Sequence, residues 1–427
     1  MIKISIMYAL VDCNSFFCSV EKVFHPGLDG KPVCVLSSND GCIVALTPEA
    51  KALGLHRGDP IFKVRDIVNQ GHVHIFSTNM PLYAAMSKRV TNILRKSVHY
   101  IENYSIDESF CFLDGYEEHH DLRQFMGEIR ERIRLWTDIP VSIGIAESKT
   151  LAKIGSKFAK QYKGYNGVCM IGTEEQRRKA LALFDLAEVW GIGRQTLAKL
   201  HYYGIRTPLQ FADKPEWWVR SHFTKPGIQT WLELNGVPCI DTAEVLQNKS
   251  ICTSRSFGSM VSDLPSLKSS VATFASSCAT KLRGQHAVAD GVTVFETSNR
   301  FREDLPQYGN ALTHRFETPT ADTIEITKAA EELLQSIWLP GILYKKSGVI
   351  MTGVHDNGLI QGNIFDPVRN RCDRKELMEA IDKINHRWGP KTIKLSVEGG
   401  EQEAWRVKHE HRSPNYLTDV NELLTVG

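Results

Sequence analysis

The first third of the chain alternates between patterns typical of strands and of helices. Short apolar runs with two-residue periodicity predict strands, and apolar residues repeating every three or four positions predict amphipathic helices. The expected order is strand 7–11, helix 79–97, two strands within 98–113, helix 120–137 and strand 140–145. This order is typical of the ferredoxin-like split motif. A turn-rich segment, 26–78, interrupts it and is expected to form a small lid-like subdomain.

The alternation of strand and helix patterns recurs after residue 250. Strands are expected at 251–258, 291–299, 311–317 and 344–354, with helices at 265–283 and 322–338. This indicates a second split motif of the same kind. Between the two motifs, Gly191-Ile192-Gly193 lies in a helical region and predicts a helix-hairpin-helix, whose exposed N–H groups can bind a DNA phosphate. The predicted class is therefore α+β with several domains.

Two neighbouring carboxylates stand out within the run Tyr104–Phe110. Asp107 and Glu108 are expected at the tip between two strands, where they repel each other. A divalent cation between them would make the arrangement favourable. Asp12 ends the first strand abruptly, so Asp12, Asp107 and Glu108 form a candidate metal cluster. The alternative is that these acids are solvated turn residues.

A row of lysines is the next signal. Lys149, Lys153 and Lys157 are spaced four residues apart, and Lys160 follows. On a helix, like charges at this spacing cost a few tenths of a kcal/mol per pair, so the row suggests a compensating anion such as phosphate. A solvated helix face is the alternative. The spacing of a Walker phosphate loop is absent.

Composition narrows the possibilities. The 427 residues suggest three or four domains, and the net charge of +2 means that any basic surface is local. The ten cysteines form no C-x-x-C pair, which argues against a zinc ribbon or a disulfide framework and favours a reducing compartment. No run approaches the length of a membrane span and the N-terminus is too short for a signal peptide, so we expect a cytoplasmic protein without a membrane partner.

These features, in this order, resemble the Y-family DNA polymerases. The resemblance rests on Asp12 at a strand-to-helix junction, the run YSIDESF, the lysine helix, the glycine hairpin and the late split motif. It covers nearly the whole chain and is closest to the UmuC/RumB-type catalytic subunit of bacterial DNA polymerase V. It begins at Met7, so residues 1–6 resemble an extension.

The resemblance implies a right-hand polymerase with four domains and a tail. The palm would comprise 7–25 and 79–166, with its ferredoxin-like fold. The fingers would be 26–78, the helix-hairpin-helix thumb 167–238, the ferredoxin-like split βαβ little finger 244–355 and the tail 356–427. The implied activity is error-prone translesion synthesis from dNTPs on primer-template DNA, in the SOS response to DNA damage.

The resemblance also implies roles for single residues. Asp12, Asp107, Glu108 and the backbone carbonyl of Cys13 would hold two Mg²⁺ ions, and Phe17 would be the steric gate against a ribose 2′-OH. Lys51 and Lys160 would bind the triphosphate. The residues expected to bind DNA are Gly191, Gly193, Arg194 and Arg255. Docking to a sliding clamp would involve Gln361, Ile364 and Phe365. A UmuD′-type dimer and RecA are implied as further partners.

The role of four arginines on or beside the late strands remains open, and so do three alternative functions of the chain. Arg255, Arg300, Arg302 and Arg315 could follow a nucleic-acid backbone or merely protect sheet edges. The same three acids could serve a metal-dependent nuclease. A DNA-binding accessory protein with a degenerate site is another alternative, and a DinB-type single-subunit polymerase is the alternative within polymerases.

Overall fold

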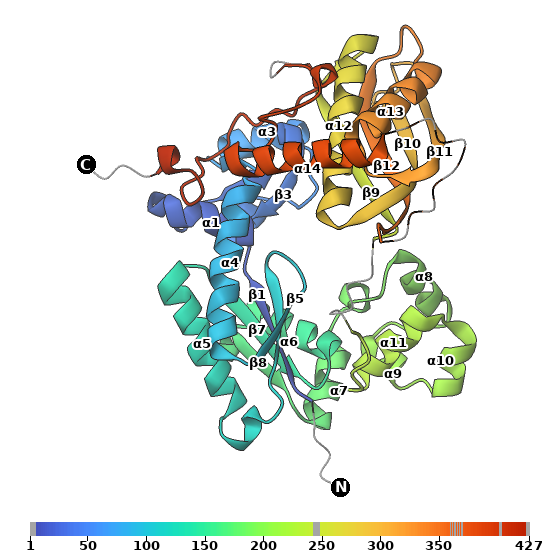
Figure 1. The fold of residues 1–427 in the computed structure, drawn as a ribbon. Helices are drawn as coiled ribbons and strands as arrows, with labels where there is room; N and C mark the ends of the chain where they lie inside the picture. The colour runs from blue at the N-terminus through green and yellow to red at the C-terminus, as the bar shows by residue number, and fades with distance from the viewer. Residues whose placement is uncertain are drawn as a thin grey trace. The chain divides into compact units, whose positions relative to one another are not determined.

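The structure is a computed structural model, and it describes residues 6–241, 248–358, 360, 362, 364, 366, 368, 370–400 and 404–423. The chain forms two compact units (Figure 1). The first contains residues up to 37, residues 41–245 and the C-terminal segment from 410. The second contains 38–40 and 246–409. Each unit is described by itself below.

A five-stranded sheet in the order β5-β6-β1-β7-β8 forms the centre of the first unit. Strand β1 (Tyr8–Cys13) lies between β6 (Glu108–Phe112) and β7 (Val141–Ala146), antiparallel to both. Strand β5 (Tyr100–Asn103) pairs with β6 on one edge. The four strands and their connecting helices confirm the predicted split motif.

The sheet continues beyond the predicted palm boundary at residue 166. Strand β8 (Val168–Ile171) pairs in parallel with β7 and adds a fifth strand. Its four residues were assigned to the thumb from the sequence. Such a short apolar run carries little periodicity, so only its pairing reveals that it belongs to the sheet.

Helices cover both faces of this sheet. One face of β1, with Ala9 and Val11, packs in the same core as α1 (Phe16–Phe24), α4 (Met80–Ser97) and α5 (Leu122–Thr137). The other face, with Tyr8 and Leu10, packs against α6 (Lys149–Gln161). Successive side chains of a strand point to opposite faces, so Asp12 lies on the α6 face of β1.

The close packing of α6 on β7 requires a glycine. A Cβ atom on Gly144 would lie 2.0 Å from the carbonyl oxygen of Ala152 and 2.1 Å from the amide nitrogen of Ser156. Both are helix backbone atoms and cannot move aside. The glycine therefore fixes how near α6, and its lysines, come to the sheet.

The insert between α1 and α4 is a small α/β layer with its own core. Its three strands, in the order β3-β2-β4, are β2 (Val33–Leu36), β3 (Ile43–Leu46) and β4 (His74–Ser77). Helices α2 (Pro48–Ala52) and α3 (Ile61–Gln70) accompany them. The sequence predicted a turn-rich subdomain here but not its strands, because the strands are four residues long and lie among many turn signals.

The region after β8 is helical within the described residues. It contains α7 (Glu174–Leu183), α8 (Arg194–Tyr202), α9 (Pro208–Ala212), α10 (Glu216–His222) and α11 (Lys225–Leu234). The expected helix just before the glycine turn is a single 3₁₀ turn, Leu186–Glu188. Gly191 has φ of +92°, which favours glycine, and a Cβ there would lie 2.3 Å from the hydroxyl of Thr230.

The second unit has the predicted element order. Its elements are β9 (Ser250–Val261), α12 (Leu264–Gly284), β10 (Ala287–Ser298), β11 (Gly309–Thr320), α13 (Thr323–Ile337) and β12 (Tyr344–Asp356). The sheet order is β11-β10-β12-β9. The last strand lies between the first two, whereas in the first unit the third strand does. Both are split βαβ motifs, as predicted, and element order alone does not fix which strands pair.

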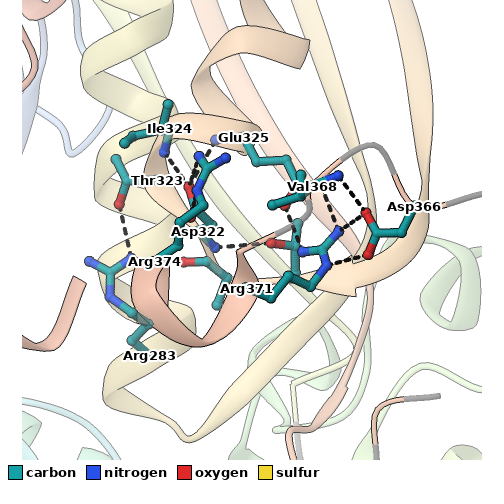
Figure 2. Close-up of polar contacts among 11 residues, drawn as sticks. Arg283, Asp322, Thr323, Ile324, Glu325, Asp366, Val368, Arg371 and Arg374 are labelled. Carbon is teal, nitrogen blue, oxygen red and sulfur yellow. Dashed lines mark hydrogen bonds and ion pairs between the residues drawn. The ribbon is translucent and has the colours of Figure 1, made fainter. Parts of the chain in front are cut away.

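Helix α14 (Arg371–Trp388) is attached to the second unit by arginines, as Figure 2 shows in part. Arg371 lies between Glu325, at 3.0 Å, and Asp366. Arg374 pairs with Asp322 at 2.7 Å. Arg283 of α12 also pairs with Asp382 of α14 at 2.7 Å. The Arg371 guanidinium holds the pKa of the Asp366 carboxyl well below its usual range. These ion pairs link α14 to α12 and to the start of α13, and so hold it against these two helices.

The structure contains no helix, among the residues it describes, that is long and apolar enough to cross a membrane.

Candidate active site

Asp12 and Glu108 are direct cross-strand partners on β1 and β6. Cβ atoms of such partners are about 4.5–5.5 Å apart, so the two side chains are neighbours. Glu108 alternates with the buried Phe110 and therefore lies on the same sheet face as Asp12. The pairing brings together two acids that are 96 positions apart in the sequence.

Asp107 joins them through the turn before β6. Its backbone carbonyl accepts a hydrogen bond from the amide of Cys13, 2.9 Å away, so the turn is fixed to the end of β1. Ser105 organises the turn: its hydroxyl accepts from the amides of Asp107, at 3.2 Å, and Glu108, at 3.1 Å, and donates to the Asp107 carboxylate. The three predicted acids thus lie at one edge of the sheet, as expected.

Lysines from α6 face these acids. Lys153 forms an ion pair with Glu108 at 2.7 Å, and the Lys160 ammonium lies 3.8 Å from a carboxylate oxygen of Asp12. Burial raises the pKa of Asp12 to about 6; Lys160 opposes this shift, whereas Glu108 and Asp107 add to it. Negative charge at Asp12 is therefore only partly compensated by the lysines.

Carboxylates are also the partners of the other predicted lysines. Lys149 is buried with Glu102, 2.7 Å away, and Lys157 pairs with Glu188 at 2.6 Å on the surface. The expectation of a phosphate compensating the whole row is therefore wrong for Lys149 and is not required for Lys157. The partners come from β5 and from the turn before α8, which sequence spacing cannot relate to α6.

We call the end of the sheet where Asp12, Asp107 and Glu108 lie the acid edge, and its oxygen ligands are suited to a divalent cation. Oxygen ligands from carboxylates suit magnesium, and the raised pKa of Asp12 marks a place where added positive charge is favourable. The Cys13 thiol is buried, which raises its pKa, so only the backbone carbonyl of Cys13 is a reasonable ligand. Among the described residues no three acidic, histidine or cysteine side chains converge as a metal-holding group. Asp107 bonds to Ser105, and Glu108 bonds to Lys153.

The two aromatic residues that begin α1 have different environments. Phe16 is 3% exposed and belongs to the core. Phe17 is half-buried, and its ring stacks on that of Tyr83 with centroids 4.5 Å apart and planes 16° from parallel. Of the two, Phe16 is buried and Phe17 is only partly buried, packed against the edge of the same core.

The other predicted site residues are dispersed over the two units. In the first unit, Lys51 is exposed on α2, and Gly191, Gly193 and Arg194 are exposed where α8 begins. In the second, Arg255 is exposed on β9. Of the expected clamp-docking residues, Ile364 is 92% exposed, whereas Gln361 and Phe365 lie outside the described residues.

Several residues at the acid edge were not assigned a role from the sequence. Ser105 forms the turn that holds Asp107. Tyr104 and Trp190 enclose Lys153, whose ammonium is 4.5 Å and 5.3 Å from their ring centroids, and the Trp190 indole donates to the Tyr104 hydroxyl at 3.1 Å. A serine two residues before the acid pair is a weak signal for this turn. The contact with Trp190 has no sequence signal, since 86 positions separate the two rings.

Comparison with known proteins agrees with this geometry. The model of the impB/mucB/samB family matches residues 11–157, and that of its C-terminal domain matches 248–364. A domain of unknown function, DUF4113, matches residues 375–426. The matches therefore include the acid edge, the second unit and most of the C-terminal segment.

Full-length relatives have the same extent as this chain. Protein UmuC of Salmonella typhimurium is 39% identical over 98% of this chain and 100% of its own length. Protein ImpB of the same organism is 37% identical over 98% and 99%, and Protein MucB of Escherichia coli 34% over 97% and 98%. A protein called DNA polymerase IV, from Dehalococcoides mccartyi, is 34% identical but covers 49% of this chain and 53% of its own length.

Solved structures share the fold. A Y-family DNA polymerase chimera of Dbh and Dpo4 aligns with a TM-score of 0.64 at 23% identity, covering 82% of this chain and all of that one. An insertion ternary complex of Dbh DNA polymerase aligns with a TM-score of 0.52 at 23% identity over the same shares. The family models and the full-length relatives establish that the chain belongs to the impB/mucB/samB family, and the solved structures show that its fold is shared with a Y-family DNA polymerase.

Proposed function

We propose that this error-prone translesion DNA polymerase of the SOS response joins dNMP units to a primer 3′-OH at the edge formed by Asp12, Asp107 and Glu108. The cross-strand pairing of Asp12 with Glu108, beside the turn of Asp107, is the observation that supports this site most strongly. The three acids come from two separated segments and meet where positive side chains from α6 face them. A solvated turn would not need this arrangement.

Divalent metal ions are the expected cofactors, and we assign Mg²⁺, with two ions per site. When bound, such ions lower the pKa of an attacking hydroxyl and stabilise a leaving pyrophosphate. Asp12, Asp107, Glu108 and the backbone carbonyl of Cys13 would hold them. The turn bonded to Ser105 keeps the backbone of Asp107 near the end of β1, beside the pair of Asp12 and Glu108.

Positive and aromatic residues around the acids would bind the nucleotide. Lys160, 3.8 Å from Asp12, is close enough to contact a triphosphate bound beside that carboxylate. Lys51 supplies a second, exposed positive charge on α2. Phe17, partly buried near the start of α1, would exclude a ribose 2′-OH by volume.

Contacts to primer-template DNA would come from both units. The amides where α8 begins, at Gly191 and Gly193, and the Arg194 side chain are suited to a phosphate, whatever the base sequence. Arg255 on β9 would make a similar backbone contact. These contacts position the duplex and do not select a sequence.

Protein partners are part of the proposal. A UmuD′-type dimer and RecA are expected from membership of the UmuC-type branch. Ile364, which is exposed, would enter a pocket of a sliding clamp with Gln361 and Phe365 as neighbours in the docking peptide. Changing Ile364 and Phe365 to Ala should weaken clamp binding and leave distributive synthesis unchanged.

End-labelled primer-template DNA separates polymerase from nuclease. With Mg²⁺ and dNTPs the primer should lengthen, and without dNTPs it should keep its length. Shortening without dNTPs, lost in Asp107→Ala, would show instead that the acids serve a nuclease. DNA binding with neither reaction, under conditions that include the proposed partners, would favour an accessory protein.

A further inference from the structure

The C-terminal segment 410–417 lies against the elements that carry the proposed steric gate. Within the first unit it follows the end of β4, the start of α4 and one side of α1. Backbone bonds fix its course: the Ser77 amide donates to the His411 carbonyl at 2.9 Å, and the His411 amide donates to the Ser77 hydroxyl at 2.9 Å. The segment belongs to the region matched by DUF4113, for which no role is given.

Ser413 reaches a fully buried carboxylate on the helix of the gate. Its hydroxyl donates to Oε1 of Glu21 at 3.0 Å, and the hydroxyl of Tyr83 donates to the same oxygen at 2.6 Å. Glu21 and Tyr83 are both 0% exposed, and burial raises the pKa of the Glu21 carboxyl, against the effect of the two hydroxyls. A buried carboxyl depends on such donors, so each of them constrains where it lies.

The same buried group connects to the Phe17 ring by two routes. Glu21 is four residues after Phe17, on the same face of α1. Tyr83, bonded to Glu21 at its hydroxyl, stacks on the Phe17 ring at its other end, with centroids 4.5 Å apart. A displacement of Tyr83 or of Glu21 therefore moves the surface on which the gate ring rests.

Other contacts hold the segment at both ends of this network. Asn79 is the N-cap of α4, accepting from the Leu82 amide, and its side-chain amide donates to the carbonyl of Ser413 at 2.8 Å. Tyr416 stacks on Phe24 at the end of α1, with centroids 4.8 Å apart. The start of α4 is thus hydrogen-bonded to the C-terminal segment, and the end of α1 contacts it through stacked rings.

We infer that the C-terminal segment sets the position of the Phe17 ring through Ser413, Glu21 and Tyr83, and thereby contributes to the choice between deoxyribose and ribose. Glu21, Tyr83 and Ser413 are positioning residues, since none of them is expected to touch the nucleotide. The inference rests on the proposed function, in which Phe17 is the gate.

Single-nucleotide incorporation of a dNTP and of its rNTP counterpart tests the inference. The full chain would be compared with Ser413→Ala, Tyr83→Phe and Phe17→Ala on an undamaged template, with thermal unfolding of each variant. Thr418→Ala is the matched control, because it removes an exposed hydroxyl from the residue that directly follows the segment. Ser413→Ala should raise the ratio of rNTP to dNTP kcat/KM about fivefold, the equivalent of one hydrogen bond. Tyr83→Phe should do the same and Thr418→Ala nothing.

The double variant of Ser413 and Tyr83 tests whether both residues act through Glu21, and Phe17→Ala tests the gate assignment itself. Ser413→Ala and Tyr83→Phe act on one oxygen of Glu21, so their combined effect should not be the product of the single effects. A lower melting temperature with an unchanged ratio in both single variants would overturn the inference while Phe17→Ala still admits rNTPs. An unchanged ratio in Phe17→Ala would instead overturn the gate assignment, and the inference with it.

Discussion

Asp12 of β1 and Glu108 of β6 face each other across an antiparallel pair, on the sheet face that α6 covers with Lys160 and Lys153. Two acids from the sheet and two lysines from α6 therefore face each other at this end of the sheet. Burial raises the pKa of Asp12 to about 6 in spite of Lys160, so a nearby cation would favour the charged carboxylate. A site of this kind is suited to bind cations on one side and a triphosphate on the other.

Neutralising either acid should abolish synthesis. Asp12→Asn or Glu108→Gln keeps side-chain size and removes the charge that would hold a metal ion. We expect primer extension to fall on the order of 10³-fold, while affinity for primer-template DNA stays within about twofold. Glu117→Gln, an exposed acid after the same strand, is the control. Retained synthesis in both variants would contradict the assignment.

The adjacent phenylalanines should separate selectivity from stability. Phe17→Ala removes a half-buried ring and should admit ribonucleotides with little loss of stability. Phe16→Ala creates a cavity in the core and should destabilise the chain by about 3–5 kcal/mol. Ribonucleotide incorporation and denaturant unfolding measure the two effects. Ribonucleotide entry with Phe16→Ala, and unchanged selectivity with Phe17→Ala, would move the gate to Phe16.

The lysines of α6 should differ sharply in their effect on stability. Lys149→Met leaves Glu102 buried without its ion-pair partner and should cost about 3–5 kcal/mol. Lys157→Met breaks a pair whose side chains are 47% and 53% exposed and should cost less than about 1 kcal/mol. Thermal unfolding of both variants is sufficient. Equal effects would show that the Lys149–Glu102 pair is not buried in solution.

Glu296 should make stability depend on pH. Burial raises its pKa from the ordinary 4.5 to about 8, and the Ser347 hydroxyl donates to its carboxyl from 2.6 Å away. The folded state therefore holds a proton that the unfolded state releases. The resulting stability is complete below pH 4.5 and is lost as the pH rises to 8, with a slope of at most about 1.4 kcal/mol per pH unit.

Glu296→Gln should remove this dependence. Unfolding measured at pH 5 and at pH 8 should show the variant gaining stability relative to the unchanged chain at the higher pH. The same difference at both values would mean that Glu296 does not carry a raised pKa. Glu303→Gln, an exposed acid that follows β10, serves as the control.

The patterns with strong periodicity were sufficient to predict most of the fold. Helices α4 and α5 begin within two residues of the expected positions, because each has a long apolar stripe and a capping side chain, Asn79 or Asp121. Weak signals were not sufficient. The strands of the insert between α1 and α4, and β8, are four residues long, and the strand order of the second unit depends on pairings that no local pattern encodes.

The candidate site shows the same limits. Asp12, Asp107 and Glu108 could be assigned together because strand ends and a family motif mark them. The partners of Lys149 and Lys157, and the stacking of Tyr83 on Phe17, arise from contacts between segments far apart in the chain. Ser413 lies 392 positions from Glu21, so its contact could only be found in the structure.

Primer extension across an abasic site, with Mg²⁺ and dNTPs, tests the central claim most directly. The full chain would be assayed alone and with its UmuD′-type, RecA and clamp partners, and the Asp107→Ala chain would be assayed in parallel. Extension past the lesion that is lost in Asp107→Ala is the predicted result. Extension that persists in Asp107→Ala, or failure under every condition with DNA binding intact, would contradict the account.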